Sequence, residues 1–108
     1  MTFQCKLQAF SSAVSEIPGD VFHYRRSRLS PPYTVWQEDG ADTLPADNHA
    51  AEQSPTGTLD YYTRQDLDPN VDAIQATLNS LPVAWHLNSV QFEEDTGIIH
   101  YEWVWSWP

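Results

Sequence analysis

The stretch Ile98-Ile99-His100-Tyr101-Glu102-Trp103-Val104-Trp105-Ser106-Trp107 decides the fold class of this chain. Its large aromatic residues stand at every second position, and a β-strand places alternate side chains on one face. The stretch therefore predicts a strand with an aromatic face. Just upstream, residues 85–93 predict a second strand, and Glu94-Asp95-Thr96-Gly97 predicts the turn that joins both strands into a terminal hairpin.

This aromatic face has two interpretations, and the sequence leaves both open. It can form the core of the domain, or it can anchor a contact between subunits, because Trp and Tyr are frequent interface anchors. The candidate interface residues on this strand are Tyr101, Trp103, Trp105 and Trp107.

Two amphipathic helices are predicted from apolar residues that recur every three or four positions. The first begins after Thr2, which can cap it, and ends before Pro18-Gly19. Its apolar stripe is Phe3, Leu7, Phe10, Val14 and Ile17. We expect Lys6 on its polar side and Cys5 as a small buried residue.

The second helix opens at Asp68-Pro69, because Asp is a good cap and Pro suits the first helical position. It ends before Pro82. Its buried stripe is Val71, Ile74, Leu78 and Leu81.

Three further strands are predicted at residues 21–25, 33–37 and 58–64, where β-branched and aromatic residues alternate with polar ones. Residues 38–55 lack a periodic apolar face and carry five acidic residues and no cation, which predicts a long mobile acidic loop. The chain of 108 residues is therefore expected to form one α+β domain, residues 1–108, with the order α-β-β-(acidic loop)-β-α-β-β. We expect a mixed, largely antiparallel sheet flanked by the two helices.

The charge of the chain is strongly negative. Fifteen Asp and Glu residues oppose five Lys and Arg residues, which gives a formal charge of −10 and disfavours binding to a phosphate backbone through surface charge. Three of the five cations, Arg25, Arg26 and Arg28, lie close together and are candidate contacts for an acidic partner. In the acidic segment, Glu38, Asp39 and Asp42 are candidate partner contacts.

The sequence gives no positive indication of catalysis, of a metal site or of a cofactor. Cys5 is the only cysteine, and the four histidines do not stand at metal-ligand spacing. Asp66 to Asp72 resembles half of a calcium loop, but Val71 replaces the required Gly and Thr77 the required Glu. His86 and His100 lie on the two strands of the predicted hairpin, where they can be cross-strand neighbours, a packing explanation that needs no metal. A small hydrolase could still be assembled from His86, His100 and the Glu93–Asp95 turn.

No apolar run approaches the ~20 residues that a membrane span needs, and the first residues do not form the apolar region of a signal peptide. We therefore expect no membrane association and a reducing cytoplasm as the place of synthesis.

Several phrases of the sequence resemble a known family. They are Val21-Phe22-His23-Tyr24, Pro32 to Asp39, Thr56 to Thr63 and Leu87 to Trp103. Together they resemble the tail-terminator or tail-completion proteins of tailed bacteriophages, which are encoded near the head–tail joining genes. The neck and head-closure proteins share this size and genomic setting, and such phrases separate these families poorly.

The resemblance implies a non-enzymatic structural protein of the virion, assembled in the bacterial cytoplasm, without a cofactor. Copies of the chain would form a ring, commonly a hexamer, that caps the tail tube and joins it to the head–tail connector. DNA would pass through the lumen without specific binding. The alternative is an acidic protein-binding module, such as a DNA-mimic inhibitor of a host enzyme, although neither predicted helix is strongly acidic.

Overall fold

The computed structural model of the protein describes residues 1–25, 30–46 and 49–108. Two helices and five strands follow one another along the chain in the order that the sequence predicted. They are α1 (Phe3–Val14), β1 (Asp20–His23), β2 (Tyr33–Ala46), β3 (His49–Thr63), α2 (Asn70–Asn79), β4 (Ala84–Glu93) and β5 (Ile98–Ser106). The predicted α+β fold is confirmed.

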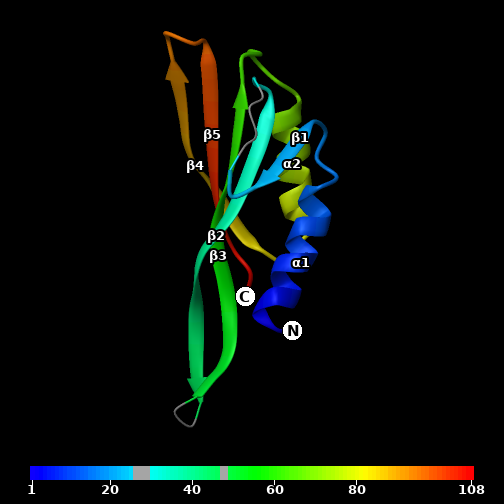
Figure 1. Ribbon diagram of the computed structural model, residues 1–108, viewed down its shortest axis with the longest axis vertical. Coiled ribbons are helices and arrows are strands. Elements are labelled where there is room, and N and C mark those ends of the chain that lie inside the picture. The colour runs from blue at the N-terminus through cyan, green and yellow to red at the C-terminus, as the bar shows by residue number, and fades with distance from the viewer. Residues whose placement is uncertain (26–29, 47–48) are drawn as a thin grey trace.

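The five strands form one mixed sheet in the order β1-β2-β3-β5-β4. β1 runs parallel to β2, and every other neighbouring pair is antiparallel. Both helices cover the same face of the sheet, and no helix of the described residues covers the opposite face, which we call the open face (Figure 1). Neither helix is long and apolar enough to cross a membrane.

The core lies between the helices and the covered face of the sheet. Opposed residues of the central strands share this face: Leu59 of β3 stands opposite Trp36 of β2 on one side and Trp103 of β5 on the other. The buried apolar residues of this cluster are Leu7, Phe10, Val14, Ile17, Trp36, Leu59, Tyr61, Ile74, Leu78, Trp103, Trp105 and Trp107. The predicted stripes of both helices contribute to it.

The cap of α1 follows from the sequence, whereas α2 begins at Asn70 with Pro69 rather than Asp68 as its N-cap. Two side chains of α1 also do not lie as expected. The Thr2 side chain accepts a hydrogen bond from the Cys5 backbone N–H, and Asp68 accepts one from Asn70 at the start of α2. Cys5 is exposed rather than buried. Lys6 is almost fully buried instead of lying on a polar surface, because a strand segment that the sequence did not predict lies over it.

The predicted acidic loop at residues 38–55 is wrong. β2 continues to Ala46 and β3 begins at His49, so these residues pair in one long antiparallel hairpin. Beyond the pair Gly40–Thr56 no third strand adjoins the hairpin in the described chain, and we call this two-stranded part, residues 41–46 and 49–55, the arm. The arm projects well past the helices and stretches the molecule to 53 × 24 × 24 Å (Figure 1).

Candidate interaction surfaces

The aromatic strand that the sequence offered as an interface belongs to the core. Trp103, Trp105 and Trp107 are all buried within the subunit. Phe10 of α1 stacks on Trp105 with ring centroids 4.1 Å apart, and the Trp103 indole donates to Gln75 of α2 at 3.2 Å. The core interpretation therefore holds for the three tryptophans within the subunit, and their role at a subunit contact stays a prediction. Tyr101 is partly buried at the edge of the same cluster.

The position of Trp105 also explains why residue 57 is a glycine. Gly57 of β3 stands opposite Trp105, and a Cβ atom built on Gly57 would overlap both the indole ring and the carbonyl oxygen of Gln37. Only glycine lets the tryptophan ring lie flat across the strand at this point. The strand is therefore fixed in position just where the arm leaves the body of the protein.

Three contacts fasten the base of the arm to the body. The Lys6 ammonium lies 3.0 Å from the Glu52 carboxylate and donates to the Gln53 carbonyl oxygen at 2.9 Å. The Trp107 backbone N–H donates to the Pro55 carbonyl oxygen at 2.8 Å. These contacts set the direction in which the arm leaves the body.

A second cluster joins the end of β1 to β2 near the base of the arm, and it consists of His23, Tyr24, Trp36 and Glu38. His23 stacks on Trp36 with centroids 3.8 Å apart, and its Nε2 lies 2.7 Å from a Glu38 oxygen. The Tyr24 hydroxyl donates to the other Glu38 oxygen. In this position Tyr24 has a left-handed backbone conformation (φ 76°), which is strained for a residue other than glycine. Burial would raise the pKa of Glu38, but the hydrogen bonds from Tyr24 and His23 lower it below its ordinary value.

The three acidic candidate contacts, Glu38, Asp39 and Asp42, all lie on β2. Glu38, expected in a mobile loop, is half-buried and engaged by two side chains. Asp39 accepts a hydrogen bond from Thr56 at 2.8 Å across the same hairpin. Asp42 lies further out and is exposed on the arm. Of the predicted acidic contacts, Asp39 and Asp42 are exposed and Glu38 is not.

The open face carries a row of stacked rings. Tyr33 stacks on Tyr62 with centroids 4.7 Å apart, and Tyr62 stacks on His100 at 4.3 Å. The His100 Nε2 lies 2.7 Å from an Asp60 oxygen. Burial raises the pKa of Asp60 above its ordinary value, although the contact with His100 acts in the opposite direction.

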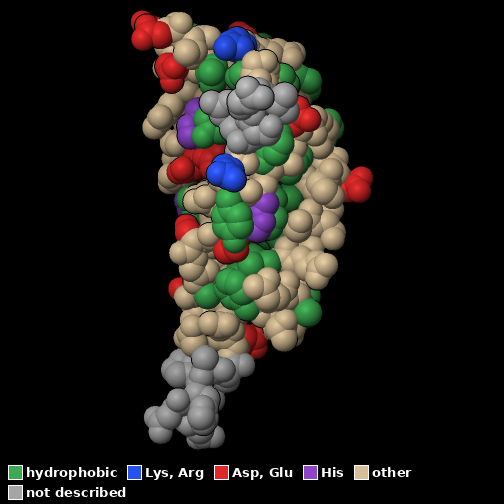
Figure 2. All heavy atoms as spheres, in the orientation of Figure 1, with side chains coloured by type: hydrophobic (Ala, Val, Ile, Leu, Met, Phe, Trp, Pro, Cys, Tyr) green, Lys and Arg blue, Asp and Glu red, His purple; other side chains and the backbone are tan. Residues whose placement is uncertain are grey.

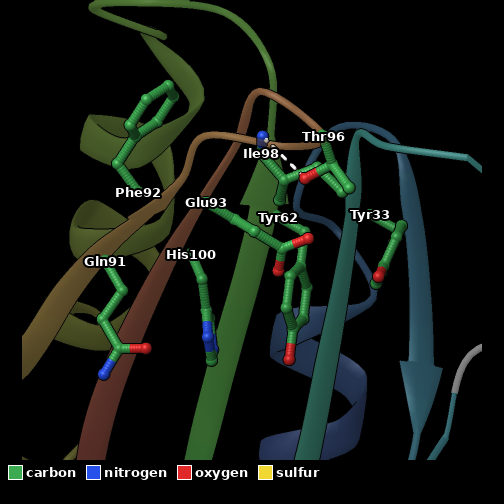
Figure 3. A pocket seen from close by; sticks show the side chains of 8 residues that line it. All are labelled: Tyr33, Tyr62, Gln91, Phe92, Glu93, Thr96, Ile98 and His100. Carbon is green, nitrogen blue, oxygen red and sulfur yellow. Dashed lines mark hydrogen bonds between the residues drawn. The ribbon is translucent and has the colours of Figure 1, made fainter.

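A shallow hollow of about 500 Å³ lies over this row of rings (Figure 3). In Figure 3, Tyr62 and His100 lie side by side in the hollow, while Phe92 points away from them. The sequence contained a signal for this face, since Asp60 and Tyr62 alternate with buried residues, but it did not show which strands would be neighbours. The predicted pairing of His86 with His100 is wrong, because His100 stands opposite Gln91 and His86 opposite Val104.

The outer strand β4 exposes an apolar row. Leu87, Val90 and Phe92 have exposed fractions of 41%, 52% and 63%. β4 is the last strand of the sheet, so the backbone on its outer side has no strand partner in the described part of the chain. Long apolar edges of this kind are usually protected by charges or proline in monomeric proteins.

The remaining charged candidates lie apart from these features. Arg25 is exposed after β1, near Asp60 and Tyr62 of the open face, whereas Arg26 and Arg28 lie outside the described residues. Acidic side chains occur along the edge of the molecule away from the helices (Figure 2). The negative charge is thus spread over the surface rather than gathered at one site.

The described residues offer no ready-made metal centre. No three His, Cys, Asp or Glu side chains in residues 1–25, 30–46 and 49–108 gather closely enough to hold an ion. In the stretch that resembles a calcium loop, both Asp68 oxygens are engaged, by Tyr61 and Thr63 on one side and by the Asn70 backbone on the other. Burial would raise the pKa of Asp68, but these hydrogen bonds lower it. Asp68 fastens α2 to β3.

Compared with models of known protein families and with curated protein sequences, the chain matches none.

Proposed function

We propose that this protein is a structural subunit of a tailed-bacteriophage virion, which assembles with copies of itself into a ring on the tail tube and joins the tail to the head–tail connector. The observation that carries this proposal is the arm. Lys6 and Trp107 support the arm at Glu52, Gln53 and Pro55, but a two-stranded hairpin that continues past such contacts is only marginally stable in water. An arm that projects beyond its own core is therefore best accounted for by a neighbouring subunit that it contacts.

The phrases that resemble the tail-terminator family agree with this proposal. They occupy β1 with Tyr24, the first part of β2, the upper part of β3, and the β4–β5 hairpin. His23, Tyr24, Trp36 and Glu38 belong to two of these phrases, and together they form the cluster at the base of the arm. The resemblance is therefore concentrated in the residues that build the sheet and orient the arm.

The charge of the chain suits the same role. A ring through which DNA passes must not bind the phosphate backbone tightly, and a formal charge of −10 per subunit repels it. The partners that we propose are further copies of the chain, the tail tube protein and the connector protein.

The proposal is tested by measuring the mass of the purified protein by light scattering, alone over a range of concentrations and after mixing with tails that lack this protein. We expect rings, about 74 kDa for six copies of the 12.3 kDa chain, visible by negative-stain electron microscopy in solution or on the tail end. A chain that stays monomeric in both settings would overturn the proposal. If that monomer instead inhibited a host nucleic-acid enzyme, the DNA-mimic alternative would take its place.

A genetic experiment tests the same role in assembly. Deletion of the gene from its phage should yield filled heads and separate tails, and addition of the purified protein should restore joining. A deletion phage that produces normal joined particles would contradict the proposal.

A further inference from the structure

We propose that the free edge of β2 in one subunit pairs with the free edge of β4 in the next, so that the sheets of neighbouring subunits become continuous. This inference rests on the proposed ring and specifies its contact. The occupant of the β4 edge is a second copy of this chain.

The first reason is that the sheet has two long free edges of equal length on opposite sides. β1 pairs with β2 only from Tyr33 to Trp36, so ten residues of β2, Gln37–Ala46, have no strand on that side among the described residues. At the other end of the sheet, β4 also has ten residues, Ala84–Glu93. A contact between two different edges is heterologous, which is the kind of contact that closes a ring.

The second reason is the direction of the strands. β2 is antiparallel to β3, β3 to β5 and β5 to β4, so β2 and β4 run in opposite directions. Subunits related by rotation around a ring would therefore bring β4 against the next β2 in the antiparallel sense. Antiparallel pairing places the backbone hydrogen bonds perpendicular to the strands and is slightly the more stable arrangement.

The third reason is the offset between the two edges along the strand direction, because the strands of a closed ring are tilted to the ring axis. β4 lies level with the upper part of β3, whereas the free edge of β2 lies level with its lower part, roughly six residues or 20 Å away along the strand. The repeat from one β2 to the next spans four strand spacings, about 19 Å. The strands would then incline by about 45° to the ring axis, close to the tilt found in closed β-barrels.

The fourth reason is charge. The free edge of β2 carries Glu38, Asp39 and Asp42 and no cation, so two such edges would repel each other. β4 has no acidic residue before Glu93, and it exposes Leu87, Val90 and Phe92. Of the two long edges, β4 is the less acidic, with Glu93 at its end as its single acidic residue, so an acidic strand meets less like charge there, and pairing would cover part of the apolar row.

The charge argument gives the first test, carried out on the assembled ring by light scattering and negative-stain electron microscopy. Val90→Asp places a carboxylate among those of the neighbouring β2, and we expect it to raise the dissociation constant of the ring at least tenfold. Leu67→Asp is the matched control, because Leu67 is 88% exposed in the connection before α2, away from both edges. Both side chains are exposed, so circular dichroism should show equal folding of the two variants.

Cross-linking gives the second test and reports the neighbours directly. In a Cys5→Ser background, a Thr43→Cys subunit mixed with a Leu87→Cys subunit should be joined by a short bis-maleimide into a dimer that holds one of each. Full overlap of the two ten-residue edges brings these positions together. Thr43→Cys mixed with Ser12→Cys, an exposed position of α1, is the control pair and should not be joined.

The outcomes separate the failure of this inference from the failure of the proposed function. Rings that form normally with Val90→Asp, without the mixed cross-link, would overturn the edge pairing and leave the ring intact. Leu87→Cys subunits joined mainly to one another would indicate a two-fold β4–β4 contact and would also overturn it. A wild-type chain that forms no ring in solution or on tails would overturn both proposals.

Discussion

The two long hairpins of this protein use the same antiparallel pairing for opposite purposes. The β4–β5 hairpin places Trp103 and Trp105 under both helices, so one of its faces becomes the core. The β2–β3 hairpin begins in the same core at Trp36 and Leu59 but continues into the arm, which Lys6 of α1 contacts at Glu52 and Gln53 and which then projects past both helices (Figure 1). The comparison teaches that the aromatic strand of this protein lies in its core. The acidic stretch without a periodic apolar face forms the projecting arm.

The largest effect is expected at the core hairpin. Trp105→Ala should lower the free energy of unfolding by about 3–5 kcal/mol, because the buried ring and its stacking partner Phe10 leave a cavity. In a domain of this size we expect the melting temperature to fall by at least 10 °C, as measured by calorimetry. Phe92→Ala, on the exposed row of the same hairpin, is the matched control with a much smaller loss. A Trp105→Ala chain that melts normally but fails to assemble would restore the interface interpretation of this strand.

A second effect is expected where the two hairpins meet. Gly57→Ala should cost about 1–3 kcal/mol, because the added methyl group collides with the Gln37 carbonyl oxygen and with Trp105. Gly40→Ala is the control, since its Cβ would meet only the Thr56 hydroxyl at an ordinary 3.6 Å. Urea unfolding of both variants measures the difference. Equal losses would mean that the close approach of Gly57 to Trp105 does not fix the base of the arm.

The surroundings of Trp105 and Gly57 also show how much of the fold could be predicted from the sequence. The spacing of apolar residues predicted both helices and the terminal hairpin, and Thr2 predicted the cap of α1, because each of these signals lies within a few residues of chain. The same spacing predicted that Trp105 lies on an aromatic face of a strand. It could not predict that α1 covers this face, because the contact of Phe10 with Trp105 joins segments almost a hundred residues apart.

The arm was missed for a physical reason. Strands are recognised by one apolar face, and a hairpin that projects from its core has no such face to reveal it. Gly40 and Pro45 are usual turn signals, yet here they lie next to register irregularities inside β2. The Lys6 contact with Glu52 and Gln53, and the open-face row of Tyr33, Tyr62 and His100, join residues from distant segments, so no local pattern announced them.

A third, moderate effect is expected from pH at the base of the arm. The pKa of Glu38 is lower in the folded protein than in the unfolded chain, so its ionised form stabilises the fold above the unfolded pKa. That contribution is lost as the pH falls through the folded pKa. Glu38→Gln should therefore lower the melting temperature by a few degrees near pH 6 and by less near pH 3. Glu93→Gln, at an exposed position at the end of β4, is the control for the removal of one carboxylate. A Glu38→Gln deficit that grows on acidification would contradict the sign.

The smallest effect is expected on the arm itself. Asp42 is exposed on the arm and stands opposite Ser54, so we expect the core not to depend on its charge. Asp42→Asn should change the free energy of unfolding by less than about 0.5 kcal/mol, as is usual for surface substitutions. Urea unfolding of the isolated subunit measures this. A loss above 1 kcal/mol would show that the arm supports the fold of its own subunit, and its projection would then no longer point to a neighbour. A near-zero loss, together with a changed ring affinity, would assign the side chain to assembly and complete the contrast with Trp105.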